Sequence, residues 1–254
     1  MQYLVTSRAG SLPLIVLVAL SCSPPRAAAQ PVPSQAPLTA KDFGAKTPPP
    51  LAVMQRLTAL RDSFVLQTKV AGFICPIGPP KIVLTDIASF GSYEPKTNVL
   101  QTPTWRQLSA DERAVFFQLA GPGADKKTAR AIFERGTHQW VFVHEMGHWW
   151  QACSHANQNR LHYRVEYDAN RIAAAYWRDS DPMLMADLAT RFQHIVERTP
   201  SPVPKDQTPE TYFNANYENL ARTRNYTWFQ AQMITSVNSE SPAPTFFQTL
   251  KEKD

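Results

Sequence analysis

WVFVHEMGHWWQAC, residues 140–153, carries the pattern on which the interpretation of the whole chain depends. It contains His144 and His148, two of the six histidines in the chain, together with Glu145. Residues 138–153 contain no proline and are strongly apolar, so they predict one continuous buried helix. Residues four apart on a helix project from the same face. The two imidazoles can therefore reach one metal ion, with the glutamate beside them.

The spacing of these side chains suits metal-assisted hydrolysis. A tetrahedral zinc ion binds imidazole nitrogens at about 2 Å, lowers the pKa of a bound water and polarises a carbonyl group. A neighbouring glutamate takes the proton of that water and passes it to the leaving amine. Random placement gives His-Glu-x-x-His in roughly a few per thousand chains of this composition. Histidines on an apolar helix are more often packed core residues, but a buried glutamate is costly without a partner, so the pattern favours metal binding.

A catalytic zinc site needs a third protein ligand and leaves the fourth position open. In the metzincin pattern a histidine follows the second motif histidine by six residues, and here that place holds Ser154. Glu166 lies eighteen residues after His148, on the next predicted helix, so we expect it to be the third ligand. The other downstream candidates by residue type are His155, His162 and Asp168.

Residues 138–177 resemble the gluzincin group of zinc metallopeptidases, in which a second helix after the His-Glu-x-x-His helix carries a glutamate ligand. The resemblance implies a zincin-like α+β fold and a Zn²⁺ site formed by His144, His148 and Glu166. It also implies that Glu145 is the general base. The chain would then hydrolyse peptide bonds in a peptide or protein substrate. The resemblance does not point to one particular peptidase family.

The chain departs from the gluzincin pattern at one place. An aspartate often follows the glutamate ligand by four residues and hydrogen-bonds a zinc histidine, whereas this chain has Asn170 there. Asparagine can accept the same hydrogen bond but lacks the charge that raises ligand basicity. We expect Asn170 to orient a ligand.

Gluzincins also place a substrate-binding edge strand before the zinc helix, and residues 88–100 are in the right order to form it. A downstream tyrosine or histidine stabilises the oxyanion. The candidates by residue type are Tyr176, His194, Tyr212, Tyr217 and Tyr226, and the sequence does not choose among them.

Two other interpretations compete with an active peptidase. The first is a catalytically inactive zinc-binding interaction or assembly protein on the same fold, in which His155 or His162 supplies a fourth ligand. A closed structural site of this kind has no use for Glu145. The second is a helical binding domain with no metal, which the rarity of the motif disfavours.

The N-terminal residues predict export of the chain. Arg8, an apolar run over residues 12–20 and small residues at 27–29 are typical of a signal peptide over residues 1–29, so we expect a secreted or periplasmic protein. Lipoprotein anchoring through Cys22 is an alternative, but residues 19–21 are a poor match to that signal. Residues 30–50 are rich in proline and alanine and predict an extended leader. We expect residues 51–254 to form a single domain.

Composition narrows the range of partners. Removing Arg8 and Arg26 with the signal leaves 24 basic and 21 acidic side chains, and the basic residues are scattered, which argues against nucleic acid. No later apolar run approaches membrane-spanning length. The mature chain keeps Cys75 and Cys153, which form a disulfide or remain buried thiols. Metal binding by Cys75 is disfavoured, because no second cysteine lies at ligand spacing.

The order of predicted elements is a short strand region followed by mostly helices. The strand region comprises residues 81–86 and two short strands within 88–100, separated by a turn at Pro95. The predicted helices cover residues 51–67, 109–120, 138–153, 163–177, 181–197, 209–221 and 226–237.

Overall fold

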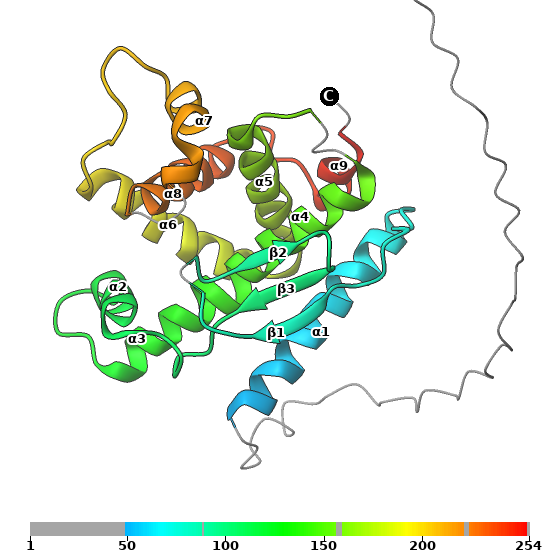
Figure 1. Ribbon diagram of the computed structural model, residues 1–254, viewed down its shortest axis with the longest axis horizontal. Helices are drawn as coiled ribbons and strands as arrows, with labels where there is room; N and C mark the ends of the chain where they lie inside the picture. The colour runs from blue at the N-terminus through cyan, green and yellow to red at the C-terminus, as the bar shows by residue number, and fades with distance from the viewer. Residues whose placement is uncertain (1–48, 88, 156–158, 221–223, 253–254) are drawn as a thin grey trace, which may run out of the picture. The chain divides into compact units, whose positions relative to one another are not determined.

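The computed structural model describes residues 49–87, 89–155, 159–220 and 224–252 (Figure 1). The strands are β1 (Lys81–Leu84), β2 (Ser92–Glu94) and β3 (Val99–Thr102). The helices are α1 (Pro49–Val70), α2 (Ala110–Ala120), α3 (Lys126–Phe133), α4 (Phe142–Ser154), α5 (His162–Ser180), α6 (Pro182–Arg198), α7 (Pro209–Leu220), α8 (Arg224–Asn238) and α9 (Phe246–Lys251). A π-helix, η2 (Glu134–Val141), joins α3 to α4. The predicted signal peptide, Cys22 and nearly all of the leader lie outside the described residues.

The strands form one small sheet in the order β1-β3-β2. β1 pairs with β3 in parallel and β2 pairs with β3 antiparallel, so Leu100 lies opposite both Ile82 and Tyr93. The side chains of Ile82 and Leu100 are buried in the main core. Because β2 is the last strand in this order, it is an edge strand, and it contacts α4.

Helix α4 lies at the centre of the described part of the chain. It contacts α1 and β2 as well as α5, and Figure 1 shows the sheet and α1 on one side of it. The side chains of Phe142 and Trp149 are buried, as expected for packing residues rather than cleft walls. A Cβ added at Gly147 would lie 3.2 Å from both the Cα and the carbonyl oxygen of Ala169 on α5. The missing side chain at Gly147 lets α4, which carries the motif, approach α5 closely.

The predicted α+β organisation is confirmed at the level of element order. Two predicted helix starts also have the expected caps. The Ser109 side chain accepts from the Glu112 N–H and the Glu112 side chain accepts from the Ser109 N–H, which is a capping box. The Asp181 side chain caps α6 at the Leu184 N–H, with Pro182 in the first turn.

One prediction of secondary structure needs correction, and two helices were missed. The continuous helix over residues 138–153 is α-helical only from Phe142, because residues up to Val141 belong to the π-helix. An almost unbroken run of buried side chains does not reveal which backbone bonding pattern the chain uses. Helices α3 and α9 were not predicted. The N-cap of α3 is Asp125, whose side chain accepts from the Thr128 N–H, so a sequence signal for this helix was present.

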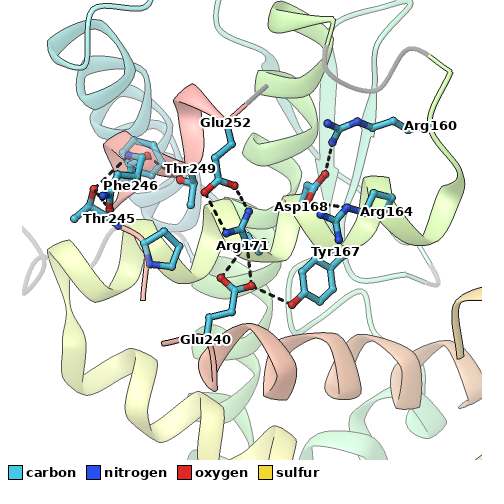
Figure 2. A network of polar contacts seen from close by, with 12 residues as sticks. Arg160, Arg164, Tyr167, Asp168, Arg171, Glu240, Thr245, Phe246, Thr249 and Glu252 are labelled. Atoms are coloured by element: carbon cyan, nitrogen blue, oxygen red, sulfur yellow. Dashed lines mark hydrogen bonds and ion pairs between the residues drawn. The ribbon is translucent and has the colours of Figure 1, made fainter. Parts of the chain in front are cut away.

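The C-terminal helices are tied to the outer side of α5 by charged groups (Figure 2). The Arg171 guanidinium donates to the Glu240 carboxylate at 2.9 Å and also pairs with Glu252. The Tyr167 hydroxyl donates to the same Glu240 carboxylate at 3.0 Å. These contacts join α5 to the segments at the ends of α8 and α9. No helix among the described residues combines the length and the apolar character needed to cross a bilayer.

Candidate metal centre

The two motif histidines lie side by side on α4. His144 and Glu145 are 6% and 7% exposed, so both are shielded from water by the surrounding helices. The Nε2 atoms of His144 and His148 are 3.1 Å apart. His144, Glu145 and His148 form a group in which one potential ligand atom of each lies within 4.8 Å of the others, a spacing that can hold a metal ion.

Glu166 on α5 brings a carboxylate to the same point. Its Oε2 lies 3.2 Å from His144 Nε2 and 3.7 Å from His148 Nε2. Two ligand atoms that bind one tetrahedral zinc ion at about 2.0–2.1 Å are themselves about 3.4 Å apart. The three measured separations bracket that value, and two nitrogens with one carboxylate oxygen are a donor set typical of catalytic zinc. These residues therefore fit a zinc ion.

Burial and the charges of neighbouring groups shift the pKa values of Glu145, His148 and Glu166. Burial raises the pKa of Glu145, although the two histidines act in the opposite direction. Burial lowers the pKa of His148, but the charge and hydrogen bond of Glu166 outweigh it and raise the pKa to about 9. Burial would raise the pKa of Glu166, yet the two histidines hold it well below its usual range. Glu166 is thus the anionic member, and Glu145 is suited to taking up a proton.

Each histidine is oriented by a side-chain amide. His144 Nδ1 donates to Asn170 Oδ1 at 3.0 Å, which is the contact expected for Asn170. His148 Nδ1 donates to Gln151 Oε1 at 2.8 Å, and Gln151 Nε2 donates to the Val165 carbonyl at 2.8 Å. Because Nδ1 is the donor in each ring, Nε2 is the nitrogen that is left for a metal when the ring is neutral. Gln151 was missed by sequence reasoning, although an amide three residues after His148 lies on a neighbouring helix position.

Glu166 has further partners from the C-terminal helices. Gln230 Nε2 donates to its Oε2 at 2.9 Å, and the Tyr217 hydroxyl donates to its Oε1 at 3.3 Å. Tyr226 also makes a side-chain hydrogen bond with Glu166, and burial, followed by the Glu166 charge, raises the Tyr226 pKa well above its usual range. Gln230 was not among the residues that the sequence singled out.

The tyrosine and histidine candidates for oxyanion stabilisation separate clearly. Tyr217 and Tyr226 both line the cleft that contains Glu145. The Tyr176 hydroxyl instead donates to Ser63 Oγ at 3.1 Å, and Tyr212 stacks on Phe229. His194 is exposed on α6. The structure thus brings two of the five candidates to the cluster.

An open cleft of about 440 Å³ lies over Glu145, His148 and Glu166. Tyr93 of β2 forms part of its wall, and the Tyr93 backbone N–H donates to the Glu145 carboxylate. A Cβ at Gly91 would overlap the Val141 side chain of η2 and lie 3.1 Å from Glu145 Cγ, so the glycine allows the segment before β2 to approach both η2 and α4. A separate apolar pocket of about 170 Å³ adjoins the cleft at Glu145.

No protein-family model, curated protein or solved structure matches this chain. The function of the site is therefore inferred from its own residues.

The remaining ligand candidates lie outside the cluster. Asp168 pairs with Arg160 and Arg164 (Figure 2). His162 stacks on the Tyr217 ring at a centroid distance of 3.9 Å, and His155 ends α4 in a left-handed conformation.

Cys75 and Cys153 are joined by a disulfide with a Cα–Cα distance of 5.2 Å. Cys153 lies in the last turn of α4, and Cys75 lies in the loop between α1 and β1. The bridge therefore ties this loop to the end of the motif helix. It also removes Cys75 from the set of thiolates that can bind a metal.

Proposed function

We propose that this chain is a zinc-dependent peptidase that acts outside the cytoplasm on peptide or protein substrates. His144, His148 and Glu166 hold the zinc ion, on a zincin-like fold. Expected export follows from the signal-like residues 1–29, and the disulfide is consistent with an oxidising compartment.

One observation carries this proposal. Glu166 is buried, and the cationic groups paired with it among the described residues are the two imidazoles. Glu145, also buried, lies beside the same imidazoles. Burying two carboxylates without an arginine or lysine partner is costly. A divalent cation at the point where the Nε2 and Oε2 atoms converge removes this cost.

The residues of the chain divide the chemistry among themselves. A bound zinc ion supplies Lewis acidity and a lower pKa for an attacking water. Glu145 takes the proton of that water on its carboxylate and then gives it to the leaving amine. Tyr217 and Tyr226 line the cleft, and a hydroxyl that turns from Glu166 to the substrate would donate to the negative charge that develops on the carbonyl oxygen. The outer edge of β2 binds the substrate backbone in extended form.

An inactive zinc-binding interaction protein is the second candidate. Asn170 favours it, because Asn170 stands where gluzincins often carry an aspartate. Such a site would be closed by a fourth side chain. Neither His155 nor His162 belongs to the group of potential ligand atoms, and Glu145 and His148 both line the open cleft. These features favour the peptidase.

The deciding experiment pairs metal analysis with cleavage of a peptide library. The purified parent should carry about one zinc per chain. Glu145→Gln should keep that zinc and lose about 10²–10⁴-fold in cleavage rate, because only the proton acceptor is removed. Glu197→Gln, which changes an exposed glutamate on α6, is the matched control and should change neither quantity.

Three outcomes separate the candidates. A parent with bound zinc that cleaves no library peptide supports the inactive binding protein. A Glu145→Gln variant as active as the parent contradicts the assigned base. A parent that binds no zinc contradicts both candidates.

A further inference from the structure

The Asn170 side chain can face His144 with either its oxygen or its NH₂ group, a choice that an aspartate does not have. A carboxylate is an acceptor at both oxygens, whereas the asparagine amide is an acceptor at one end and a donor at the other. Only the orientation with Oδ1 toward His144 leaves the ring proton on Nδ1. The opposite orientation would put the proton on Nε2, where it blocks metal binding. Something must hold the Asn170 amide in one direction.

A hydrogen-bonded chain through α8 supplies this direction. Asn170 Nδ2 donates to Gln230 Oε1 at 2.8 Å. Gln230 Nε2 donates in turn to Glu166 Oε2 at 2.9 Å. An ionised carboxylate only accepts, so Glu166 must face the NH₂ end of Gln230. The Gln230 oxygen then faces Asn170, and the Asn170 oxygen faces His144.

We propose that Gln230 is a positioning residue that fixes the orientation of the Asn170 amide, and through it the His144 tautomer. The hydrogen bond to Glu166 sets the orientation of Gln230 itself. This inference rests on the proposed metal site and deepens it. Residues of three helices, α4, α5 and α8, then form one closed circuit, because its two ends, His144 Nε2 and Glu166 Oε2, lie 3.2 Å apart. Helix α8 thus belongs to the site although it supplies no ligand.

His148 is oriented in the same way by a different amide, that of Gln151. Gln151 accepts from His148 Nδ1 and donates to the Val165 carbonyl, which also only accepts. In both cases an amide faces the imidazole with its oxygen because an acceptor-only group occupies its other end. The agreement between two separate arrangements supports direction, rather than packing alone, as the role of Gln230.

The test is a double-mutant cycle read as zinc affinity by competition with a chelator. Gln230→Met keeps the length of the side chain but removes both polar ends. It should weaken zinc binding about 10–100-fold, as loss of a group that supports a ligand does. Gln232→Met, on the same helix, is the matched control. Gln232 hydrogen-bonds Tyr163 and Ser236 instead, so this variant should keep the parent affinity.

The rescue variant is Asn170→Asp. Aspartate has no donor end, so His144 keeps its proton on Nδ1 with or without Gln230. In the N170D background, Gln230→Met should therefore change zinc affinity by no more than about twofold, the usual error of additive pairs. If Gln230 only holds Glu166, the loss is equal in both backgrounds and the proposal is wrong.

Each remaining outcome is also decisive. A Gln230→Met variant that binds zinc as tightly as the parent overturns the inference but leaves the proposed function intact. A parent that binds no zinc overturns both. Circular dichroism checks that each variant is folded, and Gln230→Ala, which suits a helix, replaces the methionine variant if that one is unfolded. The same difference between backgrounds is expected.

Discussion

The two faces of helix α5 neutralise carboxylates in different ways. On the outer face, Glu240 and Glu252 meet the guanidinium of Arg171 in a partly exposed network (Figure 2). On the inner face, Glu166 is buried and meets two imidazoles and neutral donors. An arginine fixes positive charge permanently, whereas imidazoles leave room for a metal to supply it. The comparison supports the proposal that the inner face holds a metal cation, because no arginine or lysine pairs with Glu166 among the described residues.

Removing the inner carboxylate gives the largest expected effect. Glu166→Ala takes away the anionic ligand and should reduce zinc from about one per chain to a small fraction, with affinity falling more than the 10–100-fold typical of supporting residues. Metal analysis and chelator competition measure this. Asp168→Ala changes a carboxylate two residues away that pairs with Arg160, so it should keep its zinc. Equal zinc content in the two variants would mean that Glu166 is not the third ligand.

The contact between α4 and α5 offers a second way to separate the two faces. A Cβ at Gly147 meets backbone atoms of Ala169, which cannot rotate away. Gly147→Ala should therefore lower the free energy of unfolding by about 1–3 kcal/mol, measured with urea. Because it separates the helices that carry the histidines and Glu166, it should also weaken zinc binding by about tenfold.

Gly136→Ala is the control for that substitution. A Cβ at Gly136 meets nothing within 4 Å, so the free energy of unfolding should stay unchanged or rise by up to about 1 kcal/mol. If Gly147→Ala keeps both the stability and the zinc affinity of the parent, the close approach of α4 and α5 is not what aligns the two halves of the site.

The sequence predicted most of the residues that form the inner site. His144, Glu145 and His148 share one local pattern, and the next helix offered Glu166 and Asn170 at helical spacing. All five meet in the structure, because spacing along a helix determines which side chains share a face. The role of each as ligand, base or support stays a prediction. The order of the strands and of the helices other than α3 and α9 was predictable for the same local reasons.

What the sequence missed depends on contacts between distant segments. Gln230 is 64 residues from Glu166 and 60 from Asn170, and nothing in its neighbours marks it. The choice of Tyr217 and Tyr226 over Tyr176 likewise depends on how α7 and α8 pack. Polar amides and phenols have no sequence period of their own, so their partners emerge only from tertiary packing.

The outer network should affect stability and leave metal binding unchanged. Arg171→Met keeps the aliphatic length but leaves the Glu240 carboxylate, which is 21% exposed, without its guanidinium. The free energy of unfolding in urea should fall by about 1–3 kcal/mol, the cost of losing hydrogen bonds to a charged group. Arg130→Met removes an exposed pair with Glu134 on one helical stretch and should cost no more than about 0.5 kcal/mol. Because Arg171 lies on the face of α5 away from Glu166, both variants should bind zinc as the parent does. Zinc loss in Arg171→Met alone would show that the two faces are coupled through α5 and α8, and the contrast between them would then be one of position rather than of function.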